Sequence, residues 1–273
     1  MYNITKVEAT TLPDAWYQTV YKCVEIGRDF KVDRGSYEGD TRLEFDFLVV
    51  HIKQPDAGKL GDYDALIPIM PEASTIPAPF DRSYLDDYVT YIMTGAAKEN
   101  ESYTYGQRLC RAKIEDTYPA FALLSEKEID ELCGLNIIYR ERLGLYVNQI
   151  ELLIWTYKNK GHRNNQMCMA IEQSTDCLIT DPPCLRSIDT RIQDGKLHFF
   201  PYFRSWDLFN GFPVNLAGIE ILKQYMAEQI GVENGEIIAS SKGLHMYSYV
   251  REFAEALRGK TIEEFREELR NGK

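Results

Sequence analysis

Two prolines stand directly before a cysteine in the segment TDPPCLRSIDTR, residues 180–191. Proline restricts the backbone, so the pair holds Cys184 rigidly at the start of an alternating, strand-like run. A thiolate held in this way can act as a nucleophile. The competing interpretation is a proline loop whose cysteine only fills the core, because free cysteines are among the most buried residues.

More residues with chemical capacity follow in the segment YFRSWDLFNGFPVNLAG, residues 202–218. Arg204, Ser205 and Asp207 come at the end of an aromatic, strand-like run. A Gly-Phe-Pro turn then leads to Asn215 at the start of a long apolar helix. Asn215 can be the N-cap of that helix, or its amide can bind a ligand.

A histidine and a tyrosine stand two residues apart in SSKGLHMYSY, residues 240–249. Side chains at this spacing on a strand share one face, so His245 and Tyr247 point the same way. Taken alone, the pair also fits an ordinary surface ladder. The neighbouring segments are therefore needed to interpret it.

Together, and in this order, these segments resemble the folate-type thymidylate synthase family. That family carries a Pro-Cys nucleophile, an Arg-Ser-x-Asp strand end, a Gly-x-Pro-x-Asn helix start and a His-x-Tyr pair. Upstream, DRGSYEG resembles its phosphate loop and YTYGQRL its Tyr-Gly-x-x-Arg segment. The segments DPPCLRSID and YFRSWDLFNGFP are similar to the corresponding sequences of the divergent, methanogen-type branch. The four matching segments are Pro183–Cys184, Arg204–Asp207, Gly211–Asn215 and His245–Tyr247.

The resemblance implies that Cys184 adds to carbon 6 of a uracil ring, which makes carbon 5 nucleophilic. A thiol near its ordinary pKa of about 8.5 is mostly protonated at neutral pH, so neighbouring cations must favour the thiolate. Arg204 is the expected cation, and it is also expected to bind the nucleotide phosphate together with Ser205. Arg34 is expected to add a second guanidinium to that phosphate.

The same resemblance implies that Asn215 selects the base. Its amide can donate to the carbonyl at position 4 of uracil and accept from N3–H, and cytosine presents the opposite pattern. Cytosine-selective relatives carry Asp at this position, so Asn215 favours uracil. His245 and Tyr247 are expected to bind the 3′-hydroxyl of the sugar. Asp207 is expected to hold the pterin ring of the one-carbon donor.

The chain departs from the family pattern at several positions. Family members are homodimers whose partner subunit lends an Arg-Arg pair to the phosphate, but in HRNNQ only Arg163 is present, after His162. Arg163 is the residue expected to reach across the interface. Leu185 replaces the usual His after the cysteine, and Glu72 is our candidate for the catalytic glutamate. The closing segment TIEEFREELRNGK is charged, whereas the family has a short apolar tail that shields the methylene intermediate from water.

The expected activity is methylation of dUMP at carbon 5 to give dTMP. The expected one-carbon donor and reductant is 5,10-methylenetetrahydrofolate or 5,10-methylene-tetrahydromethanopterin. The departures leave two alternatives open. In the first, water captures the intermediate and the enzyme is a 5-hydroxymethyltransferase of dUMP, UMP or a CMP-type nucleotide. In the second, the chain is a nucleotide-binding homologue without turnover.

The composition argues against several other classes. A formal net charge of −11 disfavours a nucleic-acid partner, because duplex binding needs a basic face. The sequence has no apolar stretch of about 18 residues and no signal pattern at its N-terminus, so a cytoplasmic protein without a membrane span is expected. The six cysteines form no CxxC and there are four histidines. A structural zinc site is therefore not expected, and the thiols should be reduced.

The spacing of apolar residues predicts the elements that position these residues. The last helix begins at the capping pair Thr261 and Glu264, and Ser125 with Glu128 caps an earlier one. Strands and helices mix without a strict β-α-β rhythm, which predicts one α+β domain over residues 1–273. The resemblance adds a large mixed or antiparallel sheet flanked by helices. Strands are expected at 41–53, 166–171, 177–180, 196–205 and 235–240, and helices at 81–95, 125–133 and 215–231, before two closing helices.

Overall fold

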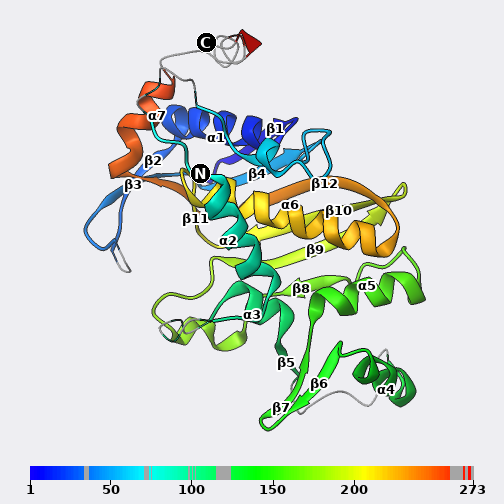
Figure 1. The fold of residues 1–273 in the computed structure, drawn as a ribbon. Coiled ribbons are helices and arrows are strands. Elements are labelled where there is room, and N and C mark those ends of the chain that lie inside the picture. Colours follow the sequence, from blue (N-terminus) through cyan, green and yellow to red (C-terminus); the bar gives the residue numbers. More distant parts are fainter. Residues whose placement is uncertain are drawn as a thin grey trace.

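The computed structural model describes residues 1–33, 37–70, 74, 76–97, 99, 101, 103–114, 124–258, 267, 270 and 271. Its main sheet contains the strands β1 (Ile4–Ala9), β4 (Phe47–Ile52), β8 (Cys168–Ala170), β9 (Leu185–Gln193), β10 (Lys196–Phe203) and β12 (Glu233–Ser241). Their order is β1-β4-β12-β10-β9-β8 (Figure 1). The β1–β4 and β10–β12 pairs are parallel and the others antiparallel, so the sheet is mixed.

Two smaller sheets accompany the main one. The first consists of β2 (Arg28–Lys31), β3 (Thr41–Glu44), β11 (Trp206–Asp207) and β13 (Leu244–Tyr247), in the order β11-β13-β3-β2. The second consists of β5 (Ala112–Ile114), β6 (Ile138–Glu141) and β7 (Gly144–Val147), in the order β5-β7-β6. In the four-stranded sheet, Asp207 lies beside His245, and Arg42 lies opposite Tyr247. This sheet therefore assembles much of the candidate site.

Helices cover the main sheet. Helix α1 (Leu12–Ile26) packs on β1 and β4, and α6 (Gly211–Ile230) packs on β10 and β12. Helices α2 (Arg82–Met93) and α5 (Gln149–Lys160) pack in turn on α6. The other described helices are α3 (Tyr105–Cys110), α4 (Glu126–Gly134) and α7 (Arg251–Arg258), with the short 3-10 helices η1 (Tyr63–Leu66), η2 (Ser174–Leu178) and η3 (Ser248–Val250). The three-stranded sheet and α4 lie at the opposite end of the molecule from α1 and α7 (Figure 1).

Helix α6 lies at the centre of the hydrophobic core. Its apolar residues face the main sheet and the surrounding helices, so the helix is buried on nearly every side. Even the charged pair Glu220 and Lys223 is fully buried, with their side chains 2.8 Å apart. Gly231 ends the helix in the left-handed conformation, φ 87° and ψ 37°, which glycine adopts without steric cost.

The structure confirms the α+β class and several elements. Helices α2 and α4 lie where the sequence predicts them, and the capping box of Ser125 and Glu128 is present. Helix α6 begins earlier than predicted, with Asn210 as its N-cap. Asn215 therefore lies inside the helix and is free of an N-cap role. Thr261 and Glu264 lie outside the described residues.

Two predicted strands are wrong. The segment 41–53 is not one strand, because the chain bends near Asp46 and its two halves join different sheets as β3 and β4. The segment 177–180 contains the end of η2 and a bend. There Asp176 accepts a hydrogen bond from the N–H of Gln173 and ion-pairs with two arginines, which holds the chain in a tight turn.

Candidate active site

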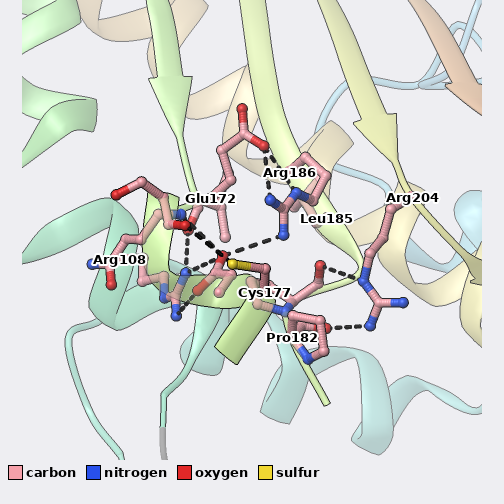
Figure 2. A network of polar contacts seen from close by, with 12 residues as sticks. Arg108, Glu172, Cys177, Pro182, Leu185, Arg186 and Arg204 are labelled. Carbon is pink, nitrogen blue, oxygen red and sulfur yellow. Dashed lines mark hydrogen bonds and ion pairs between the residues drawn. The ribbon is translucent and has the colours of Figure 1, made fainter. Parts of the chain in front are cut away.

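Cys184 immediately precedes β9, and one arginine holds the loop that carries it. Nε of Arg204 donates to the carbonyl of Pro183 at 3.2 Å, and Nη2 donates to the carbonyl of Pro182 (Figure 2). Nη2 also lies 3.3 Å from a carboxylate oxygen of Asp181. The backbone N–H of Arg204 donates to the carbonyl of Cys184 at 2.8 Å. A guanidinium only donates hydrogen bonds, so the clamp holds the two prolines through their carbonyl oxygens.

The thiol of Cys184 lies in a partly buried environment with several charges. Burial raises its pKa above the ordinary value, and Arg204 is the strongest opposing influence. The carboxylate of Asp181 raises the pKa further, whereas Arg186 and Arg42 lower it. Arg204, the expected cation, and two further arginines therefore act on the thiol, but burial outweighs them and favours the protonated form in this structure.

A network of ion pairs anchors the beginning of β9 (Figure 2). The buried carboxylate of Asp176 lies 2.8 Å from Nη2 of Arg108 and 3.2 Å from Nη1 of Arg186. Glu172 lies 2.9 Å from Nη2 of Arg186. Burial by itself raises the pKa of Asp176, but the hydrogen bonds from Arg108 and the neighbouring charges hold it below its ordinary value. The network joins α3, η2 and β9 around the cysteine loop.

Asn215 faces a cavity of about 580 Å³ from the second turn of α6. Its Oδ1 accepts a hydrogen bond from Nε1 of Trp206 at 2.9 Å. Its Nδ2 donates to the hydroxyl of Tyr88, also at 2.9 Å. The amide is therefore held from two sides by side chains of β11 and α2.

Asp207 lines the same cavity. Its carboxylate accepts hydrogen bonds from the backbone N–H groups of Phe209 at 3.1 Å and Gly211 at 3.3 Å. Burial raises the pKa of Asp207 above its ordinary value, although these hydrogen bonds lower it. The backbone N–H and the side chain of Asn210 also donate to this carboxylate, so groups of its own loop occupy most of its acceptor sites.

His245 and Tyr247 lie on β13, as the sequence predicts. Nδ1 of His245 lies 2.9 Å from the carbonyl of Gly243, while Nε2 has no partner among the described residues. Burial lowers the pKa of His245 to about 4, so the ring is neutral at pH 7. A neutral ring that donates from Nδ1 presents Nε2 as an acceptor. Burial raises the pKa of Tyr247 to about 12, with further contributions from Asp207 and Cys184.

Arg42 is a site residue that the sequence does not reveal. It lies opposite Tyr247 on β3, and its guanidinium pairs with Glu44 at 2.6 Å. Its charge lowers the pKa of both Cys184 and His245. The strands that bring it to the site are distant in the sequence, so no local pattern predicts its position.

Comparison with known proteins identifies the family. A model of the thymidylate synthase family matches residues 101–268, which is more than half of the chain. The chain belongs to the thymidylate synthase family. A Methanosarcina mazei protein, provisionally named a thymidylate synthase, is 27% identical over 89% of each chain. A similarly named Methanothermobacter thermautotrophicus protein is 26% identical over 88% of this chain and 92% of its own. A Corynebacterium aurimucosum thymidylate synthase is 32% identical over 38% of this chain and 39% of its own.

Membership in the thymidylate synthase family makes the chain an enzyme of the methyltransferase type. The family uses a nucleotide substrate and a folate-type co-substrate. No helix among the described residues is long and apolar enough to cross a membrane. Those residues also contain no cluster of three or more His, Cys, Asp or Glu side chains that could hold a metal ion.

The remaining predicted site residues are placed less centrally. Ser205 is half-buried between β10 and β11, beside the backbone of Gly243. Arg163 is exposed in the loop after α5. Arg34 and Glu72 lie outside the described residues. The described structure therefore brings together Cys184 and its downstream partners, and it leaves Arg163 at the surface.

Proposed function

We propose that the protein methylates dUMP at carbon 5 to give dTMP, through a covalent adduct of Cys184 at carbon 6. The observation that carries this proposal is the meeting of a nucleophile, an oriented amide and a carboxylate. Asn215 and Asp207 line one cavity. After burial, Asp207 and Cys184 contribute to the raised pKa of Tyr247, so both lie near its hydroxyl.

Cys184 has the role of the nucleophile in this proposal. The attacking form is the thiolate, which adds to carbon 6 and leaves carbon 5 able to attack an electrophilic carbon. Burial opposes loss of the thiol proton, and Arg204 is the group that favours it most. The guanidinium of Arg204 therefore supports the reactive thiolate, and its clamp on the proline carbonyls keeps the sulfur in place.

Three residues are assigned to bind the base and the sugar of the nucleotide. Asn215 donates to the carbonyl at position 4 of uracil and accepts from N3–H. The unpartnered Nε2 of neutral His245 is an acceptor that fits the 3′-hydroxyl of the sugar. The hydroxyl of Tyr247 stays protonated at neutral pH, with a pKa of about 12, and can donate to the same hydroxyl.

The phosphate is assigned to a group of cations and one hydroxyl. Arg204 and Ser205 are adjacent at the strand end, and Arg34 is the further expected contact. Arg42 is a further candidate for a phosphate contact, because its positive charge lowers the pKa of both Cys184 and His245. Arg163 is assigned to the phosphate of the partner subunit in a homodimer.

The pterin is assigned to the cavity that Asp207 and Asn215 line. The residues fit such a group, because the cavity wall combines the carboxylate of Asp207 and the amide of Asn215 with the aromatic side chains of Phe80, Tyr84 and Tyr88. The co-substrate supplies the one-carbon unit and the hydride that reduces it. We include both the folate and the methanopterin donor in the proposal. Glu72 remains the candidate for the catalytic carboxylate.

A homodimer is part of the proposal. One face of the main sheet carries the half-buried apolar side chains Phe47, Val49, Phe200, Tyr202 and Ile238. Burial of such a row against a second copy removes apolar surface from water. We propose a single catalytic domain and a cytoplasmic location, which accords with the six free cysteines. Analytical ultracentrifugation tests the dimer, and a monomer at micromolar concentration would contradict it.

Release of tritium from carbon 5 of labelled dUMP tests the proposed reaction. Purified protein is incubated with the labelled nucleotide and each pterin donor, and tritium in water is counted. The Cys184→Ala variant is expected to lose release while it still binds dUMP. The matched control is Cys177→Ala, because this cysteine is exposed in the preceding η2. Turnover by Cys184→Ala would remove the nucleophile assignment.

Product mass then separates the related activities. A methyl group gained by dUMP supports the proposal, whereas a hydroxymethyl group shows that water has captured the intermediate. Parallel incubations with UMP and dCMP identify the preferred nucleotide. Absence of tritium release from the unaltered protein with either donor would reject the proposed reaction and leave a nucleotide-binding role.

A further inference from the structure

The amide of Asn215 is held between the side chains of Tyr88 and Trp206, and Trp206 occupies the variable position of the Arg-Ser-x-Asp segment. Nε1 of Trp206 lies 2.9 Å from its Oδ1, and the hydroxyl of Tyr88 lies 2.9 Å from its Nδ2. Indole has an N–H donor and no acceptor. The amide atom that faces Trp206 must therefore be the oxygen, and the NH₂ group must face Tyr88.

A flipped amide would place two donors against each other. The NH₂ group would then face the indole N–H, and the indole would lose its partner in a buried site. In the observed orientation each amide atom keeps one further bond, since oxygen has a second lone pair and nitrogen a second hydrogen. The remaining donor and acceptor match the carbonyl at position 4 and the N3–H of uracil. Cytosine matches the flipped amide.

Packing keeps the indole in place. Trp206 is 2% exposed. Its ring stacks on Phe203 with a centroid distance of 3.8 Å, and the ring of Phe212 lies 4.6 Å away. The indole N–H therefore points at Asn215 from a position with little freedom.

Packing also keeps the Tyr88 ring in place. A Cβ atom added to Gly218 on α6 would lie 2.6 Å from two carbons of this ring. The absence of a side chain at Gly218 therefore allows the ring to lie directly against α6. Asn215 lies one turn before Gly218 on the same helix, so the hydroxyl of Tyr88 is within hydrogen-bond distance of the amide.

We propose that Trp206 and Tyr88 are positioning residues that hold Asn215 in the orientation that reads uracil and rejects cytosine. This inference rests on the proposed function, because it takes Asn215 to contact the pyrimidine. It assigns the choice of base to the orientation of the amide, which Asn215 alone does not determine.

The test compares the binding of dUMP and dCMP by isothermal titration calorimetry. Trp206→Phe replaces the indole by a smaller aromatic ring without an N–H donor, and Tyr88→Phe removes only the hydroxyl. The ratio of the two dissociation constants is expected to move toward unity by about tenfold in Trp206→Phe, and further in the double variant. The matched control is Trp155→Phe, because Trp155 is buried in a separate apolar cluster with Leu132, Ile137 and Ile138.

The outcomes separate the inference from the reaction. If Trp206→Phe weakens both nucleotides equally, the indole is only structural and the inference is overturned. An unaltered protein that binds dUMP and dCMP equally well also overturns it. If the unaltered protein prefers dUMP and Trp206→Phe lowers that preference, the inference holds even where no tritium is released. Should Trp206→Phe fail to fold, an unchanged ratio in Tyr88→Phe would overturn the inference.

Discussion

Replacement of His245 by asparagine is expected to remove an acid-sensitive contribution to the free energy of unfolding. The ring is 3% exposed, and burial lowers its pKa from 6.5 to about 4. Between these two values the unfolded chain binds the proton that the folded chain excludes. The stability that comes from the neutral ring is therefore complete above the ordinary pKa. It is lost as the pH falls toward the folded pKa.

The magnitude follows from the two pKa values. The pKa falls from 6.5 to about 4, and each tenfold change in proton affinity corresponds to about 1.4 kcal/mol. The whole effect is therefore about 3 kcal/mol of unfolding free energy. Most of it is lost between about pH 7 and about pH 4.5, because the folded ring stays mostly neutral over that interval.

Urea denaturation of the unaltered protein and His245→Asn measures this loss at about pH 7 and about pH 4.5. Other titrating groups contribute to both proteins, so the difference between the two losses isolates His245. The exposed His162 gives the control variant His162→Asn, which also removes one histidine. Equal losses in the unaltered protein and in His245→Asn would refute the reasoning. If His245→Asn does not fold, NMR titration of the unaltered protein decides, and a His245 signal that titrates near its ordinary pKa contradicts burial of a neutral ring.

The other predictions concern the cation on β3 and the glycine on α6. Arg42→Gln is expected to weaken dUMP binding about tenfold or more and to leave deoxyuridine binding nearly unchanged, because a charged hydrogen bond to phosphate contributes about 1.5–3 kcal/mol. Calorimetry with both ligands measures this, with Glu44→Gln as the control that keeps the guanidinium; equal losses exclude a phosphate contact. Gly218→Ala is expected to lower the unfolding free energy by about 1–3 kcal/mol, because its Cβ would lie 2.6 Å from the Tyr88 ring. Gly134→Ala, with no atom within 4 Å of the new Cβ, is the control in urea denaturation, and equal stabilities contradict the overlap.

Local patterns predicted those elements whose causes are local. The capping box of Ser125 and Glu128 marks the start of α4, and Gly231 marks the end of α6. Both signals involve backbone groups within a few residues, so the sequence contains the whole cause. The strand predicted over 41–53 is wrong because alternation of apolar residues does not say which sheet a residue joins. The bend near Asp46 separates β3 and β4, and each pairs with strands from distant parts of the chain.

In the candidate site too, some features follow from the sequence and others only from the structure. The order and spacing of the motifs around Cys184, Arg204, Asn215 and His245 identify the family and its chemistry from the sequence alone. The contacts that these residues make could be seen only in the structure. The sequence suggested an N-cap as one role for Asn215, but the helix begins earlier and Trp206 holds its amide.

The sequence by itself determined which functional groups this protein carries, in what order, and which short segments form helices. Those properties depend on residue type and on neighbours along the chain. Only the tertiary structure decided that burial favours the thiol at Cys184, that His245 is neutral, and that Arg42 belongs to the site. Burial and electrostatic effects depend on distances in space, and the contacts that create them join strands and helices far apart in the sequence.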